Sequence, residues 1–141
     1  MVYVQTLGRT LDLVIDGDER RSVMWKNSNA LKEGLRELGY YIGPGDSPIC
    51  SLFIPVREET VEAVGVRTVS FLREHGIFVT AVTYPVIPLG LCMFRMIPTA
   101  VHTQEDVAQT VDAFKRMRDE LGLDLTIEKE DQTKVRKVFG T

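Results

Sequence analysis

The sequence lacks the long apolar runs, one-sided charge and targeting signals that identify many classes of protein. No apolar stretch reaches the roughly 18 residues of a membrane-spanning helix, and Met1 is not followed by a basic and then apolar signal segment. The chain has 17 Lys and Arg residues against 20 Asp and Glu, so its net charge of −3 favours neither nucleic acid nor an anionic membrane. We therefore expect a cytoplasmic protein with no transmembrane segment and no nucleic-acid partner.

Signatures of nucleophilic catalysis and of metal binding are also absent. There is no glycine-rich nucleotide motif, no GxSxG, no HExxH and no CxxC. His75 lies in the last turn of a predicted helix, and His102 directly precedes a predicted helix cap, so both are interpreted as structural residues. Cys50 and Cys92 lie within apolar runs, which favours buried free thiols. No catalytic, cofactor-binding or metal-binding residue is predicted.

The sequence does contain helical and strand patterns in alternation. Apolar residues at helical spacing predict helices over 2–15, 18–38, 58–75 and 103–121, and continuous apolar runs predict strands over 49–56, 77–83 and 91–97. The proline-rich connection between the last two strands makes them an antiparallel pair. These elements predict an α/β fold of the α+β two-layer sandwich type, with about three mainly antiparallel strands packed against helices.

Local signals predict how the helices begin and end. Asp18 is expected to cap the second helix, and Thr103 with Asp106 is expected to form a capping box at the start of the last one. Gly39 and Gly122 are expected to end these two helices. Residues 123–141 form a charged tail with weak patterning, for which a strand at 123–127 and partial disorder both remain open.

Arg95 is the single charged residue within the apolar strand predicted over 91–97. Burying a guanidinium group without an anion is costly, so Arg95 should face a ligand, a partner or water. Its planar fork suits a carboxylate or a phosphate. Ligand binding and a simple outward orientation on a solvent-exposed face both remain open.

The segment from Gly76 to Asp106, GIFVTAVTYPVIPLGLCMFRMIPTAVHTQED, resembles the C-terminal region of the α-oxoamine synthase family. The likeness is carried by Tyr84-Pro85, Pro88, Gly90, Arg95 and His102-Thr103. The predicted helix Arg20–Gly39 and the tripeptide Ser47-Pro48-Ile49 match the same family in the same order. The resemblance therefore covers roughly residues 4–122 and leaves the tail unexplained.

Members of this family condense an amino acid with an acyl-CoA by means of pyridoxal 5'-phosphate, and they include 8-amino-7-oxononanoate synthase, glycine C-acetyltransferase and serine palmitoyltransferase. The resemblance implies the small C-terminal domain of a fold-type-I enzyme over residues 1–122, with residues 1–15 as the connecting helix. It also implies that Arg95 binds the carboxylate of the substrate amino acid. Met93 stands where the family usually has a second arginine.

The lysine motif with which the family holds its cofactor is not found in these residues, and the lysines present are expected on polar surfaces. The resemblance thus implies a fragment that is inactive alone, binds no cofactor by itself and works with an N-terminal domain that binds pyridoxal phosphate, as a homodimer. The first helix, with Val4, Leu7 and Leu11, is expected to mediate self-association. A free-standing carboxylate-binding or regulatory module and the small domain of an aminotransferase remain alternatives. The amino acid and the acyl-CoA are not determined.

Overall fold

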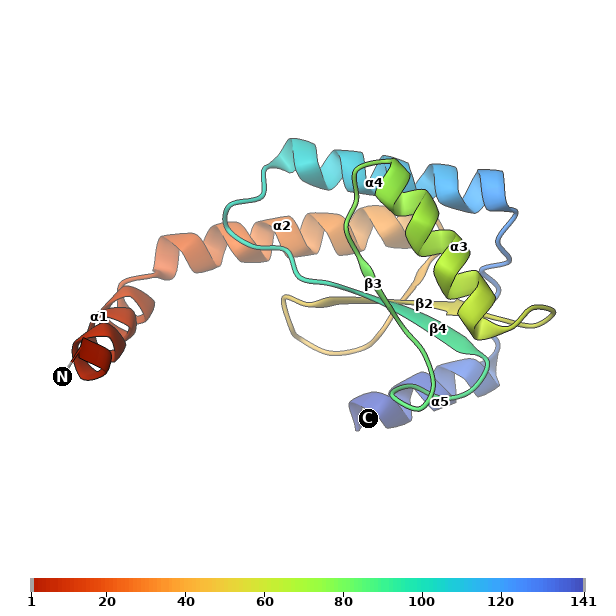
Figure 1. Cartoon of the computed structure of the whole chain (residues 1–141), viewed down its shortest axis with the longest axis horizontal. Coiled ribbons are helices and arrows are strands. Elements are labelled where there is room, and N and C mark those ends of the chain that lie inside the picture. The colour runs from red at the N-terminus through yellow and green to blue at the C-terminus, as the bar shows by residue number, and fades with distance from the viewer. Residues whose placement is uncertain (1, 141) are drawn as a thin grey trace.

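Five helices and four strands make up the computed structural model, which describes residues 2–140 (Figure 1). Met1, the first residue of the expected connecting helix, and Thr141, the last of the tail, lie outside the described residues. In chain order the elements are α1 (Val2–Ile15), α2 (Asp18–Glu37), β1 (Tyr41–Ile42), β2 (Cys50–Pro55), α3 (Val61–Glu74), β3 (Thr80–Val82), β4 (Leu91–Met96), α4 (Gln104–Leu121) and α5 (Lys129–Phe139).

The strands form one antiparallel sheet in the order β1-β2-β4-β3. Its centre is the pairing of β2 with β4, whose register runs from Cys50 opposite Met96 to Pro55 opposite Leu91. The pairing of β3 with β4 confirms the antiparallel pair expected around the proline-rich connection. The α/β class is confirmed as well, with β1 as a fourth strand that the sequence did not predict.

Helices α2, α3 and α4 cover one face of this sheet, and the main hydrophobic core lies between them and the strands (Figure 1). Phe114 of α4 is at its centre with no exposed surface. Its ring meets Tyr40 and Phe94 edge to face, at centroid distances of 5.6 and 6.1 Å. The Tyr40 hydroxyl donates a hydrogen bond of 2.8 Å to the Phe114 carbonyl, so the one polar group of this aromatic cluster is satisfied.

The opposite face of the sheet, called here the outer face, is covered in part by α5 (Figure 1). Val135 of α5 has no exposed surface and packs with Phe53, Ile87, Leu91 and Met93. A helix in the tail was not predicted, and residues 123–127, for which a strand had remained open, form none. Three charged residues in the first turn, Lys129, Glu130 and Asp131, obscured the apolar positions that α5 uses for packing.

An ion pair attaches α5 to the end of β2. Asp131 is 2% exposed, and its carboxylate accepts two hydrogen bonds from the guanidinium of Arg57, which is 40% exposed. Burial alone would raise the pKa of Asp131, but the hydrogen bonds from Arg57 and from the backbone amide of Glu128 outweigh it and hold that pKa below its ordinary value. Asp131 is therefore ionised in the folded protein at neutral pH.

Two expectations about α2 were wrong. Asp18 is the first residue of the helix, and the N-cap position is held by Gly17, which provides no side-chain cap. Lys32, expected on a polar surface, is only 7% exposed. Its amino group donates a hydrogen bond to the carbonyl of Ser47, so the loop before β2 covers it. The same amino group lies 6.0 Å from the ring centre of Trp25, in the same helix. By contrast, both hydrogen bonds of the Thr103–Asp106 capping box are present.

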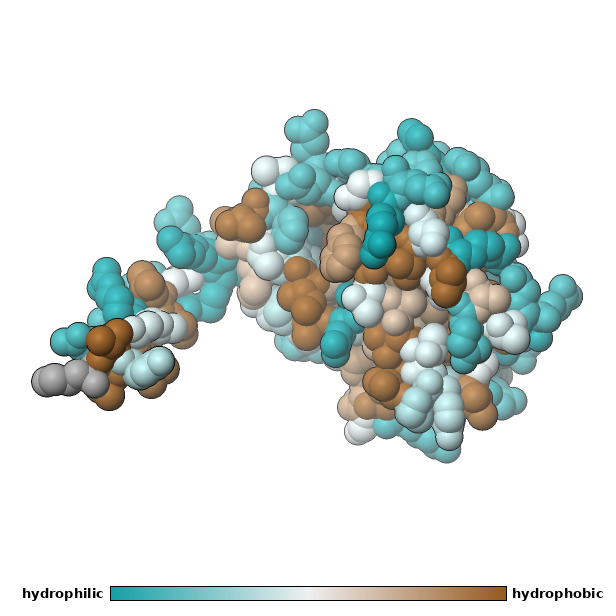
Figure 2. Space-filling view, viewed as in Figure 1, coloured by the Kyte–Doolittle hydropathy of each residue, from teal (hydrophilic) through white to brown (hydrophobic). Residues whose placement is uncertain are grey.

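Helix α1 forms as predicted but projects away from the rest of the chain, and none of its described residues is buried (Figure 1). Apolar side chains are prominent on it in Figure 2, and Val4, Leu7 and Leu11 are 59–73% exposed. Arg21 at the start of α2 donates to the last carbonyls of α1. Self-association through this helix stays a prediction.

The aromatic cluster around Phe114 predicts a large effect of truncation. Phe114→Ala removes a fully buried ring, and the unfilled cavity should lower the free energy of unfolding by about 3–5 kcal/mol. Phe78→Ala is the matched control, since Phe78 is 81% exposed and its truncation should cost about 1 kcal/mol or less. Urea denaturation followed by circular dichroism measures both. Equal effects of the two variants would contradict the observed core.

The Arg57–Asp131 pair predicts a pH dependence. At neutral pH, Asp131→Asn removes the charge that binds Arg57 and should lower the free energy of unfolding. Because Arg57 is partly screened by solvent, we expect a loss of only about 1–2 kcal/mol. Since the folded pKa of Asp131 is depressed, this difference is complete above about pH 4 and disappears as the pH falls through the folded pKa. Denaturation over a pH series compares the two proteins. Asp112→Asn, which removes an exposed ion pair with Arg116, is the control and should show a much smaller difference.

Candidate functional site

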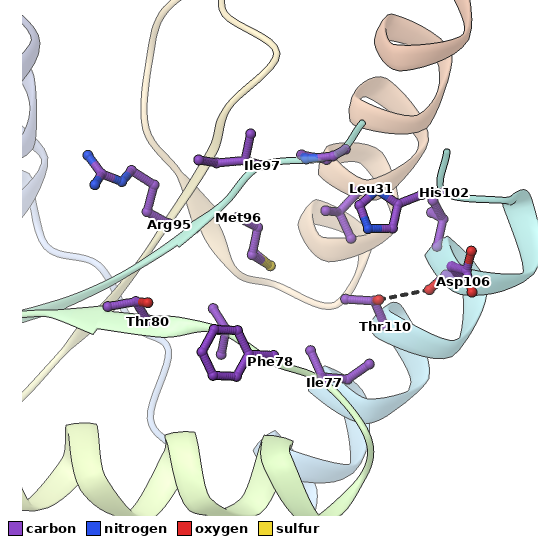
Figure 3. A pocket seen from close by; sticks show the side chains of 13 residues that line it. Leu31, Ile77, Phe78, Thr80, Arg95, Met96, Ile97, His102, Asp106 and Thr110 are labelled. Atoms are coloured by element: carbon purple, nitrogen blue, oxygen red, sulfur yellow. Dashed lines mark hydrogen bonds between the residues drawn. The ribbon is translucent and has the colours of Figure 1, made fainter. Parts of the chain in front are cut away.

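A pocket of about 300 Å³ lies where β3 and β4 approach the first turns of α4 (Figure 3). Its wall is mainly apolar, with Leu31 from α2, Phe78 before β3, Met96 at the end of β4 and Ile97 directly after it. Arg95 and Thr80 line one side of it, and His102, Asp106 and Thr110 line the other. Its volume is at the lower end of the range for small-molecule sites.

Arg95 lies on the outer face of the sheet, where it pairs with Ser51 on one side and Thr80 on the other. It is the single exposed residue of β4, because each of the other five is buried. Among the described residues 2–140, no side chain or carbonyl makes a hydrogen bond or ion pair with its guanidinium group. The strand pairing thus presents a cation between two small polar neighbours, which suits a planar anion from outside the chain.

The opposite side of the pocket is occupied by a helix start. The Nδ1 atom of His102 accepts a hydrogen bond of 2.9 Å from the Thr99 amide, which leaves the proton of a neutral ring on Nε2. The carboxylate of Asp106 accepts from the Thr103 amide at 2.7 Å and from the Thr103 hydroxyl at 2.8 Å, and these bonds lower its pKa. Figure 3 shows the Arg95 side chain pointing away from His102, so the two do not form one catalytic group.

Asn27 of α2 holds the connection between β4 and α4, and sequence reasoning missed it. Its side chain is 1% exposed and donates to the carbonyls of Thr99, at 3.0 Å, and His102, at 2.7 Å. Its own carbonyl oxygen accepts from Gln104 at 2.6 Å. The sequence did offer one signal, because Asn27 is a polar residue four positions before Leu31, on the side of α2 that is buried. Asn27 therefore fixes the turn that forms one wall of the pocket.

The remaining reactive side chains have structural roles. Cys50 and Cys92 are free and buried, as expected, and burial raises the pKa of each thiol to about 11. The His75 ring stacks on Phe71 at 4.3 Å and its Nδ1 atom contacts the Phe71 carbonyl at 2.9 Å. Within residues 2–140 there is no group of three His, Cys, Asp or Glu residues suited to a metal ion. No helix in this range is long and apolar enough to cross a membrane.

The lysines of this chain do not fit a covalent attachment site for an aldehyde cofactor. None of the lysines in the described range lines the pocket. Lys32, the buried one, already donates to the Ser47 carbonyl. Lys134 pairs with Glu130 on the surface of α5. Arg95 lies at the edge of this mainly apolar pocket, and its side chain can hold an anion on the outer face of the sheet.

Comparison with known proteins shows similarity to a group of acyltransferases. The chain is 38% identical over 122 residues to the cysteate-C-fatty acyltransferase of Capnocytophaga ochracea, a match that spans 86% of this chain and 28% of that protein. It is 37% identical over 100 residues to the 8-amino-7-oxononanoate synthase of Exiguobacterium sibiricum, which spans 71% of this chain and 24% of that enzyme. The chain thus covers about a quarter of the length of these curated relatives. No family model matches it.

The fold is found in a solved acyltransferase as well. The serine palmitoyltransferase of Sphingomonas wittichii superposes with a TM-score of 0.66 and 28% identity, over 74% of this chain and 26% of that one. Other solved serine palmitoyltransferases with this fold contain pyridoxal phosphate. The comparison confirms the fold expected for a small domain of a fold-type-I enzyme.

The hydrogen bonds of Asn27 predict a specific local effect. Asn27→Ala leaves the carbonyls of Thr99 and His102 without a donor and should lower the free energy of unfolding by about 1–3 kcal/mol. The His102 amide, which donates to the Thr99 carbonyl, should exchange its hydrogen faster in this variant. Asn29→Ala, an exposed position in the same helix, is the control and should change neither quantity. Unchanged His102 exchange in Asn27→Ala would contradict the assigned role.

Proposed function

Because the chain is homologous to the small domain of the α-oxoamine synthase family, we propose that it contributes the substrate-binding arginine to an acyl-CoA:amino acid C-acyltransferase. The observation that carries the proposal is Arg95, a cation without a partner in an otherwise buried strand, at the side of an apolar pocket. The proposed enzyme depends on pyridoxal 5'-phosphate, acts in the cytoplasm as a homodimer and takes an amino acid and an acyl-CoA as substrates.

Arg95 would bind the carboxylate of the amino acid through two parallel hydrogen bonds. Such a bidentate contact fixes the direction of the bond between the α-carbon and the carboxylate, and so orients the reacting carbon. Its cross-strand neighbours are Ser51 and Thr80, whose side chains are short and carry no charge. They therefore do not compete with a substrate carboxylate for the guanidinium group. The buried strand keeps the Arg95 backbone in place, so little ordering is required of it when the substrate binds.

The cofactor would supply the electron sink for the condensation, and the residues that hold it would come from a second domain. This requirement follows from the chain's own lysines, since Lys32 is engaged with Ser47 and the others do not line the pocket. The exposed apolar surface of α1 provides one area for contact with such a domain or with a second subunit.

Purification of the protein from its own cells tests the proposal. A tag placed in the 141-residue region should recover pyridoxal-phosphate absorbance, and the material should release free coenzyme A from acyl-CoA only when an amino acid is added. A preparation without the cofactor that still binds small carboxylates would instead identify a binding module. Transamination in place of coenzyme A release would identify an aminotransferase.

Arg95 variants test the proposed role of that residue in the same preparation. Arg95→Ala should raise the KM for the amino acid by about 10- to 100-fold, because charge-assisted hydrogen bonds are lost. The amino-acid KM of Arg95→Lys should lie between those of the wild type and Arg95→Ala, since lysine keeps the charge and loses the planar fork. Cofactor absorbance should be unchanged in both. Arg116→Ala, on the exposed side of α4, is the control and should leave the amino-acid KM unchanged. If Arg95→Ala also leaves this KM unchanged, Arg95 is not part of the site.

A further inference from the structure

Helix α5 lies on the same face of the sheet as Arg95. Alternation along β4 places Leu91, Met93 and Arg95 on the outer face, and the first two belong to the apolar cluster that α5 covers. Met93 is 7% exposed, whereas Arg95 is exposed. The edge of the α5 contact therefore falls between Met93 and Arg95, about 7 Å apart along the strand.

The side chains that attach α5 form a single stripe. Asp131, Val135 and Phe139 follow one another at intervals of four residues, so they lie on one side of the helix. Asp131 binds Arg57, Val135 enters the outer-face cluster, and the Phe139 ring meets Phe53 edge to face at 6.2 Å. The contact at Phe139 is close, because a Cβ atom on Gly43 would lie 2.8 Å from that ring.

The same stripe holds the proline-containing loop between β3 and β4. Ile87 is 2% exposed although Tyr84, Val86 and Leu89 around it are 58–71% exposed. The burial of Ile87 comes from the cluster in which Val135 lies. At the end of this loop the Gly90 carbonyl accepts a 2.8 Å hydrogen bond from the Val56 amide, next to Arg57. Loop, strand end and ion pair thus meet under α5.

We propose that α5 is a positioning element for the Arg95 site, with Asp131 and Val135 as the residues that hold the Tyr84–Gly90 loop and the adjoining part of β4 in place. That Arg95 binds substrate rests on the proposed function. That α5 holds the loop and the start of β4 rests on the contacts of Asp131 and Val135 alone. Loss of these contacts frees the loop and the start of β4, while the core on the other face, built from α2, α3 and α4, is retained.

Hydrogen exchange in the full chain tests the structural step. Val135→Ser removes the apolar contact and Asp131→Asn removes the charge, so two different changes probe the same attachment. In both variants, the Ile87 amide, which donates to the Thr83 carbonyl, should exchange about 10-fold faster than in the wild type. The Val56 amide, which donates to the Gly90 carbonyl, should behave in the same way. Exchange of the Leu72 amide of α3 should be unchanged. Val138→Ser is the matched control because Val138, on the same helix, is 43% exposed. If the α5 amides become exposed and the loop amides do not, α5 is only a cover and the proposal is wrong.

Kinetics of the enzyme that contains this chain test the effect on the site. Val135→Ser should raise the KM for the amino acid several-fold and leave kcat at saturation nearly unchanged, and Val135→Ile should restore the wild-type KM. If Arg95→Ala weakens amino-acid binding and Val135→Ser does not, this inference fails while the proposed function stands. If Arg95→Ala has no effect, the proposed function fails, whatever the exchange of the loop amides shows.

Discussion

The antiparallel pairing of β2 with β4 determines where the other strands and the helices that pack on the sheet lie. Both strands are hydrophobic on two faces, and their six-residue register places Leu52 beside Phe94 on the core side and Phe53 beside Met93 on the outer side. A slip of one residue would exchange these sets and would also turn Arg95 into the core. The helices on one face and α5 on the other can be packed only with this register.

The same pairing accounts for the character of the candidate site. A guanidinium group on a strand buried at five of its six positions is stable only where the cover of the sheet ends, which happens just beyond Met93. Asn27 then fixes the chain that leaves β4, through hydrogen bonds to Thr99 and His102. The site is therefore bounded by α5 on one side and by the Asn27 turn on the other, both attached by buried polar groups.

The elements that were predicted have strong local signals, and β1 and α5, the two elements that were missed, have weak ones. The helix ending at Gly122 and the capping box at Thr103 depend on neighbouring residues, and both were found. Strand β1 has two residues, too few for a period to be visible. In α5 the apolar stripe has one residue per turn among many charges, so its pattern resembles that of an unstructured tail.

The sequence by itself determined the main helices and strands, the antiparallel pair around the proline loop and the singular position of Arg95. These follow from periodicity, turn residues and one charge in an apolar run, all of which act over a few residues. Only the tertiary structure decided the burial of Lys32, Asn27 and Asp131, and the face on which Arg95 lies. The partners of Asn27 are 72 and 75 residues away and Arg57 is 74 residues from Asp131, so no local pattern contains them. A buried polar group is identified by its partner, and the partner is brought to it only by the fold.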